Sequence, residues 1–260
     1  MKISVFVNPS KKEEKEELKR EIEKIALSFN FEIDEENPDV VFACGGDGTM
    51  LRGIHTYFKK LDSIKFFGAN FGHLGFFYNY EKDEVVEALK ALKDSELEVT
   101  THKFIKADIE NNDGSISTIY AINEFRIEDN INLIETNVSI DGEFFESYAG
   151  TGLSISTPIG STAYNLLLGG SAVSPEMECI QIVPVQASSF SKSFKSSLVL
   201  PPNKTIVLEG PFNNVLLGND HVVREKVSFK SIKISSCNYE FKLLNKKGNN
   251  SLSRLIKLFS

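Results

Sequence analysis

The sequence predicts a Rossmann-like, three-layer α/β domain over residues 1–97, followed by an antiparallel β-rich, sandwich-type domain over residues 98–244. Before residue 97, short apolar runs alternate with apolar stripes at helical spacing, a pattern typical of a parallel sheet covered by helices. After it, helical spacing largely disappears and strand patterns separated by turn signals take over. With 260 residues, 41% hydrophobic and 25% charged, the chain has ordinary globular composition and a length at which one domain commonly becomes two.

Three strand-and-helix units make up the predicted α/β domain. The strands are expected at residues 2–8, 40–44 and 64–69, each a short apolar run. A helix is expected after each strand, because apolar residues then recur every three or four positions. The three stripes consist of Leu18, Ile22, Ile25 and Phe29; of Met50, Leu51, Ile54, Tyr57, Phe58 and Leu61; and of Val85, Val86, Leu89 and Leu92.

The second domain is predicted from alternating segments such as 98–109 and 116–128. Asp113-Gly114 and Asp141-Gly142 are expected to form hairpin turns, since aspartate and glycine tolerate the positive φ angles of tight turns. The tail over residues 245–260 is predicted to fold back onto the first domain as a short amphipathic helix. The stripe of that helix consists of Leu252, Leu255, Ile256 and Phe259.

Charge and composition exclude several classes of function. The formal net charge is -7, so the long-range field repels polyanions and no nucleic-acid partner is expected. The three cysteines are far apart and the four histidines have no ligand spacing, which predicts neither a disulfide framework nor a metal site and fits a reducing cytoplasm. The first residues combine a short apolar stretch with dense charge, unlike a signal peptide or a membrane span. We therefore expect a cytoplasmic protein without a membrane partner.

The run Gly45-Gly46-Asp47-Gly48-Thr49 lies between a predicted strand and a predicted helix. Glycines let a ligand approach the backbone closely, and the first turn of a helix offers N–H groups to an anion, so the run predicts a phosphate-handling turn. Asp47 could accept a proton from an attacking hydroxyl or help to hold magnesium. Two simpler interpretations stay open, namely a tight turn without ligand and an aspartate or threonine that caps the helix.

The turn is neither a Walker A loop, which requires a lysine, nor the GxGxxG turn of a dinucleotide fold. It resembles the GGDGT signature shared by NAD kinases, diacylglycerol- and sphingosine-type lipid kinases and, in varied form, phosphofructokinases. A second segment, Thr157–Asn165, contains a proline and a glycine that favour a bend, hydroxyls able to cap a helix, and Tyr164. This corner suits a ribose and a flat ring. The alternative is a capped helix whose tyrosine packs in the core.

The segment Thr157–Asn165 resembles the TPTGSTAY motif of NAD kinases, with Ile159 replacing the second threonine, and lipid kinases lack this motif. The loop over 70–76 resembles the family's GxLGF loop, and Asn123-Glu124 resembles its NE pair. The resemblance implies phosphorylation of the adenosine 2′-hydroxyl of NAD by ATP or polyphosphate, with Mg²⁺ or another divalent cation accompanying ATP. It also implies a homodimer or homotetramer.

The resemblance assigns roles residue by residue. Asp47 is implied as the proton acceptor, Gly46 and Gly48 lie against phosphates, and Arg52 reaches an anionic ligand. The residues implied to contact the dinucleotide are Phe76, Asn123, Glu124, Thr151, Thr162, Ala163 and Tyr164.

Two positions depart from the family pattern. Thr151 stands where the family has an aspartate that helps to bind the nicotinamide end, and Leu167 replaces a serine. A charged hydrogen bond contributes about 1.5 to 3 kcal/mol, so the far end of the dinucleotide is where recognition is expected to differ. These losses keep open a non-catalytic NAD or NADP sensor. The Asn8-Pro9-Ser10 turn keeps open a lipid kinase.

Overall fold

The computed structural model describes residues 1–7, 12–72, 75–188, 194–248 and 255–256. Contacts within the chain divide it into two compact units. Unit 1 comprises Met1–His102 and Glu240–Ser260, and unit 2 comprises Lys103–Tyr239. The predicted Asn8-Pro9-Ser10 turn lies outside the described residues, as does most of the predicted tail helix.

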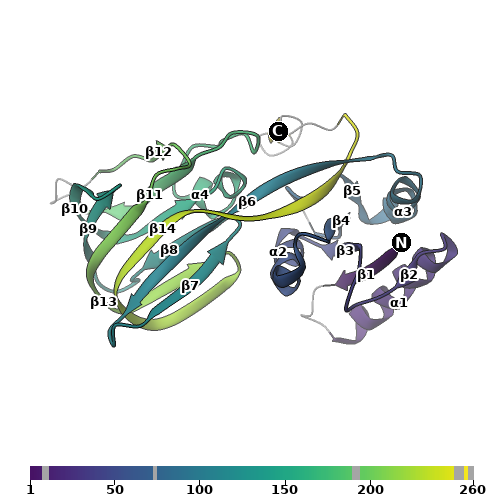
Figure 1. Cartoon of the computed structure of the whole chain (residues 1–260), viewed down its shortest axis with the longest axis horizontal. Helices are drawn as coiled ribbons and strands as arrows, with labels where there is room; N and C mark the ends of the chain where they lie inside the picture. The colour runs from purple at the N-terminus through teal and green to yellow at the C-terminus, as the bar shows by residue number, and fades with distance from the viewer. Residues whose placement is uncertain (8–11, 73–74, 189–193, 249–254, 257–260) are drawn as a thin grey trace. The chain divides into compact units, whose positions relative to one another are not determined.

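Unit 1 is built on a parallel sheet with the order β2-β1-β3-β4, and β5 pairs with the end of β4 (Figure 1). The end of β14 also pairs with β4 in parallel register. The strands are β1 (Lys2–Val7), β2 (Glu32–Ile33), β3 (Val40–Gly45), β4 (Lys65–Asn70) and β5 (Tyr80–Glu81). The helices are α1 (Lys12–Ser28), α2 (Asp47–Thr56), η1 (Phe58–Lys60), η2 (Lys82–Glu84) and α3 (Val85–Lys93).

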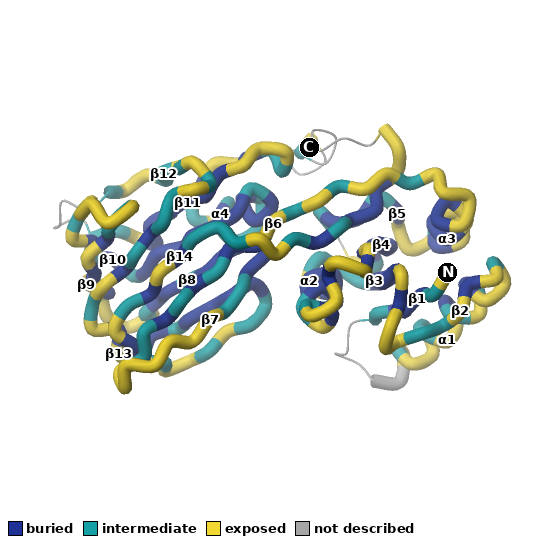
Figure 2. Tube along the Cα trace, viewed as in Figure 1, coloured by how far each residue is buried: buried dark blue, intermediate teal, exposed yellow. Residues whose placement is uncertain are grey.

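The helices of unit 1 cover both faces of this sheet. The apolar stripes of α1 and α3 form one core cluster with alternate residues of β1, β3 and β4, such as Val5, Phe42 and Phe67. On the opposite face, Gly53 of α2 lies next to Phe6 and Val41, and Met50 and Ile54 of α2 are fully buried. Figure 2 shows both buried and exposed segments along α2. The three stripes predicted from helical spacing therefore face the sheet, except for Val86 of the third stripe, which is 54% exposed. Unit 1 has three layers.

Unit 2 consists of antiparallel strands around one apolar cluster. Two of its long strands, β10 and β13, each pair with β9 along one half and with β8 along the other. The strands are β6 (Leu97–Asn111), β7 (Ile116–Ala121), β8 (Glu124–Glu128), β9 (Ile134–Ile140), β10 (Glu143–Ser156), β11 (Ile180–Ala187), β12 (Leu198–Leu200), β13 (Ile206–Asn219) and β14 (Val222–Lys246). The predicted fold class, α/β followed by an antiparallel β-rich part, is confirmed.

The local turn predictions for unit 2 also hold. Gly114 has φ 84°, and Asp141 and Gly142 have φ 52° and 82°, so both hairpin turns use the left-handed backbone that was expected. The segment predicted as one strand over 116–128 is instead interrupted between Ala121 and Glu124. Among the described residues, no helix is long and apolar enough to cross a membrane.

Candidate active site

The glycine turn joins β3 to α2 in unit 1. Gly46 is the N-cap residue of α2, and no side chain caps this helix. At Gly45 a Cβ atom would overlap the side chain of Thr49, so only glycine fits. At Gly46 and Gly48, by contrast, a Cβ would meet no atom within 4 Å. The turn therefore presents open backbone at the start of a helix, where anions bind favourably.

The Asp47 carboxylate is oriented by backbone groups from a different loop. Its Oδ2 accepts the N–H of Phe76 at 2.8 Å and its Oδ1 accepts the N–H of Phe77 at 3.1 Å. The capping interpretation of Asp47 is thus wrong, because its carboxylate bonds to this loop and Gly46 occupies the cap position. The turn and the loop that contains Phe76 are brought together.

Tyr78 also links this loop to the glycine turn, and it was not predicted as a site residue. Its hydroxyl donates to the Gly46 carbonyl at 3.0 Å, and burial, followed by the neighbouring Asp47 charge, raises the pKa of Tyr78. The ring also leaves no room for a side chain at Gly75, where a Cβ would lie 2.8 Å from it. The sequence signal was a tyrosine two residues after the predicted loop over 70–76.

Asn70, at the end of β4, fixes the other end of the loop. Its Oδ1 accepts the N–H of Gly72 at 3.0 Å, and its Nδ2 donates to Glu81 at 3.1 Å. The N–H of Phe71 donates to the Gly45 carbonyl at 3.2 Å. Residues 73–74 of the predicted loop lie outside the described residues. The described part of the loop thus borders the glycine turn from both ends.

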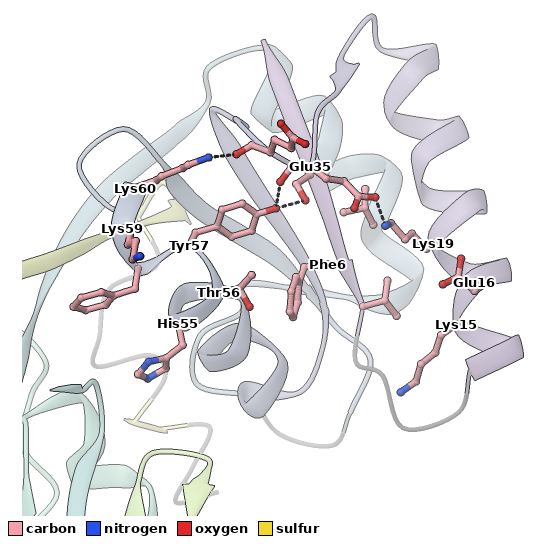
Figure 3. Close-up of a pocket in the computed structure, with 15 residues that line it drawn as sticks. Phe6, Lys15, Glu16, Lys19, Glu35, His55, Thr56, Tyr57, Lys59 and Lys60 are labelled. Carbon is pink, nitrogen blue, oxygen red and sulfur yellow. Dashed lines mark hydrogen bonds and ion pairs between the residues drawn. The ribbon is translucent and has the colours of Figure 1, made fainter. Parts of the chain in front are cut away.

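A cavity of about 950 Å³ lies beside β1 and α2 in unit 1 (Figure 3). Several of its polar groups satisfy one another: the Tyr57 hydroxyl bonds to Ser4 Oγ at 2.9 Å and to the Glu35 carbonyl at 2.7 Å. Lys15 lines the same cavity, and burial and the charge of Arg52 lower the pKa of Lys15. Lys15 on α1 and Arg52 on α2 therefore lie close enough for their charges to interact. None of the predicted site residues lines this cavity.

In unit 2, the Asn123-Glu124 pair lies at a buried corner before β8. Thr157 donates its N–H to the Asn123 carbonyl at 2.9 Å and its hydroxyl to the Ile122 carbonyl at 2.6 Å. At Gly160 a Cβ would lie only 2.5 Å from the Asn123 Cα, so a glycine is required for this close approach. The structure thus joins the two motifs that the sequence singled out.

Each side chain of the Asn123-Glu124 pair has a buried oxygen that makes no hydrogen bond to the described part of the chain. Asn123 Oδ1 and Glu124 Oε2 are buried and have no hydrogen-bond partner among the described residues. Burial first, and then the nearby Asp220 charge, raises the pKa of Glu124 to about 8, against a smaller opposing effect of Arg126. Glu124 is therefore largely neutral at pH 7 and is able to donate as well as accept a hydrogen bond.

Tyr164 lies in a second part of unit 2, next to Thr151. Both line a cavity of about 380 Å³ together with Glu128. The Tyr164 hydroxyl donates to Glu128 Oε1 at 2.7 Å, and the Arg126 guanidinium lies 4.5 Å from the ring centroid. One face of the tyrosine predicted for stacking is thus occupied by an arginine.

The segment between these two parts differs from the expected capped helix. It forms a 3₁₀ turn, η3 (Ile159–Thr162), and a single helical turn, α4 (Tyr164–Leu167), neither with a side-chain cap. The Ser161 hydroxyl donates to the Pro158 carbonyl at 2.6 Å instead. Thr162 and Ala163 lie in this segment and are half-buried, whereas Leu167 is 82% exposed.

Sequence reasoning missed the charged face of β8. Glu124, Arg126 and Glu128 alternate at period two, so they share one face of a strand whose other face is apolar. That alternation in an otherwise buried strand was a signal, because buried charges need partners or a function.

Comparisons with known proteins agree with this geometry. Residues 1–97 match the ATP-NAD kinase N-terminal domain, and residues 123–246 match the ATP-NAD kinase C-terminal domain. The chain is 38% identical over 217 residues to NAD kinase 1 of Bacillus cereus, covering 82% of each chain. Its fold is shared with yeast NADH kinase in complex with NADH, at a TM-score of 0.83 and 21% identity over 100% of this chain and 87% of that one. The fold is also shared with an NAD kinase from Archaeoglobus fulgidus in complex with ATP, at a TM-score of 0.78 and 22% identity over 100% of this chain and 97% of that one.

The two matched family models cover the α/β unit with its open glycine turn and the antiparallel unit with its buried polar corner, and they show a phosphotransferase of the kinase class. Within that class, the chain belongs to the ATP-NAD kinase family and is an NAD kinase. This assignment decides among the kinase families that share the GGDGT signature.

Proposed function

We propose that this enzyme transfers the terminal phosphoryl group of ATP, or of polyphosphate, to the adenosine 2′-hydroxyl of NAD and so forms NADP. The observation that carries the proposal is the open backbone at Gly46 and Gly48 beside the oriented carboxylate of Asp47. The open backbone at the start of the helix can bind phosphates, and the carboxylate can accept the proton of an attacking hydroxyl. Family membership supports the same reaction.

Asp47 is the proposed proton acceptor. As the bond between the 2′-oxygen and the γ-phosphorus forms, the bond from that phosphorus to the β,γ-bridging oxygen breaks and ADP leaves. The 2′-hydroxyl proton passes to the Asp47 carboxylate. The Asp47 carboxylate accepts hydrogen bonds from the N–H groups of Phe76 and Phe77. Those two bonds orient the group for this step.

The dinucleotide is assigned to unit 2. Asn123 and Glu124 bring two buried side-chain oxygens without partners, which supports their proposed bonds to adenine and ribose. Phe76, Thr151, Thr162, Ala163 and Tyr164 are proposed as further dinucleotide contacts. We assign the phosphoryl donor to residues 1–97 and the dinucleotide to residues 98–244.

A divalent cation is proposed to accompany the donor phosphates. Among the described residues, no group of three or more His, Cys, Asp or Glu side chains is placed to hold a metal ion. Mg²⁺ commonly uses one or two carboxylates together with substrate phosphates, so the donor phosphates would supply much of its coordination, and a role of Asp47 as metal ligand is the alternative to its role as proton acceptor. Bound there, the cation would neutralise charge on the transferred phosphoryl group.

The direct test is to incubate the purified chain with NAD, Mg²⁺ and either ATP or polyphosphate, and to measure NADP. NADP formation is expected with at least one donor. If neither donor yields product while calorimetry detects tight NAD or NADP binding, the protein is a dinucleotide sensor and the kinase proposal is wrong. Phosphorylation of diacylglycerol in liposomes would instead support the lipid kinase alternative.

Arg52 is proposed to bind the donor phosphates, because it lies on α2 about one helical turn after the open backbone at Gly46 and Gly48, where a cation suits an anionic ligand. Arg52→Ala is expected to raise KM for ATP about tenfold, as one charge-assisted hydrogen bond is lost, and to leave KM for NAD within about twofold. Steady-state kinetics with each substrate varied would measure this. Lys59→Ala removes an exposed lysine of η1 that lines the cavity, and it is the matched control. Equal effects of both variants would refute a specific role of Arg52.

We also propose a cytoplasmic homodimer or homotetramer. Family membership supports this assembly, and sedimentation of the purified chain measures it.

A further inference from the structure

Asp220 lies in the two-residue turn between β13 and β14, where Asn219 pairs with Val222. Its φ of 51° is in the left-handed region, which aspartate tolerates better than most residues. The residue is only 6% exposed although it is charged and sits in a turn. A buried carboxylate in a hairpin turn requires partners that compensate for its desolvation.

Those partners are three consecutive backbone N–H groups before and at the start of β8. Asp220 Oδ1 accepts from Asn123 at 2.6 Å, from Ile122 at 3.0 Å and from Glu124 at 3.3 Å. Its Oδ2 accepts from Ile122 at 2.8 Å. The N–H of Asp220 donates in return to the Glu124 carbonyl at 3.1 Å. The turn and the Asn123-Glu124 pair are therefore bonded in both directions.

These bonds explain why the segment over 116–128 is not one strand. Ile122 and Asn123 stand between β7 and β8, and the Asp220 carboxylate takes their N–H groups. From the opposite direction, the Thr157 hydroxyl and N–H hold the carbonyls of Ile122 and Asn123. The backbone N–H groups of Ile122 and Asn123 are thus bonded to Asp220, and their carbonyls are bonded to Thr157.

We propose that Asp220 is a positioning residue of the dinucleotide site, which acts by holding the backbone of Asn123 and Glu124. The proposal rests on the proposed function, because it treats that pair as substrate contacts. The side chains of Asn123 and Glu124, whose buried oxygens lack partners among the described residues, therefore depend for their placement on the β13–β14 turn, about 100 residues away in the sequence.

The charge of Asp220 also acts on Glu124. The charged groups facing Glu124 are Asp220 from the β13–β14 turn and Arg126 and Glu128 from its own strand. Asp220 and Glu128 raise the pKa of Glu124 and Arg126 lowers it. Removing the Asp220 charge is therefore expected to lower the pKa of Glu124 and to move any pH dependence of NAD binding that Glu124 causes toward lower pH.

Two substitutions separate placement from charge. Asp220→Asn removes the charge and sets an amide donor against the three N–H donors, whereas Asp220→Glu keeps the charge and displaces it by one methylene. Asp141→Asn is the matched control, since Asp141 has φ 52°, lies in a two-residue turn between β9 and β10, and accepts the Thr205 N–H at 2.8 Å.

The expected kinetic result is a rise of at least tenfold in Kd and KM for NAD in both Asp220 variants. KM for ATP should stay within twofold, and Asp141→Asn should behave as wild type in both. Only Asp220→Asn is expected to shift the pH profile of NAD binding. A merely structural role predicts instead a lower kcat from fewer folded molecules, with Kd and the pH profile unchanged, and that outcome would overturn the proposal.

Hydrogen exchange provides a readout that does not depend on activity. The amides of Ile122, Asn123 and Glu124 are expected to exchange at least tenfold faster in Asp220→Asn than in wild type or Asp141→Asn. Unchanged exchange would overturn the proposal even if NAD binding fell. Wild-type protein that binds neither NAD nor NADP would refute the proposed function and the substrate role of the pair together. Normal wild-type binding with unaltered variants would refute only the role of Asp220.

Discussion

Asp47→Asn is expected to lower kcat by roughly 10²- to 10⁴-fold, the usual contribution of a positioned general base. An amide cannot take the hydroxyl proton, while most contacts to the two substrates are retained. KM for NAD and for ATP should therefore change by less than about fivefold. Initial rates of NADP formation with each substrate varied would measure both parameters.

The control for this substitution must separate proton transfer from support of the loop, because Asp47 also accepts the N–H groups of Phe76 and Phe77. Tyr78→Phe removes the bond from the Tyr78 hydroxyl to the Gly46 carbonyl and leaves the carboxylate in place. Its kcat is expected to fall less than tenfold. If Tyr78→Phe loses as much activity as Asp47→Asn, the carboxylate serves to hold the loop and is not the base.

Glu124→Gln is expected to remove a large pH dependence of stability. Unfolded Glu124 ionises near its ordinary value of 4.5, whereas the folded residue keeps its proton until about pH 8. Between these values the folded state binds the extra proton, so the free energy of unfolding falls as pH rises. At about 1.4 kcal/mol per unit, wild type should lose on the order of 4 kcal/mol more than Glu124→Gln between pH 4.5 and pH 8.5.

Urea unfolding of both proteins across that range measures this difference. At pH 4.5 the two should be similarly stable, and at pH 8.5 the glutamine variant should be the more stable. Glu128→Gln, on the same face of β8, is the control and should keep most of the wild-type dependence, because Glu128 makes the smallest of the four contributions to the pKa of Glu124. Parallel curves for wild type and Glu124→Gln would show that Glu124 ionises freely in the folded protein.

The prediction for Glu124 could not have been made from the sequence. The NE pair was predicted as a contact with adenine and ribose, without a protonation state. Burial at 4% exposure and the approach of Asp220 decide that state, and both depend on residues about 100 positions apart. The same holds for Tyr164, which was predicted to stack on a ligand and which has one ring face occupied by Arg126.

The sequence by itself determined the strand-turn-helix units, the two hairpin turns and the open glycine turn, because these depend on interactions between near neighbours. Apolar spacing selects helix or strand, and glycine permits backbone angles closed to other residues. Only the tertiary structure decided what Asp47 bonds to, why β8 begins at Glu124, and which buried oxygens lack partners. Those features arise where distant segments meet, and their energies come from desolvation and hydrogen bonds that local sequence does not encode.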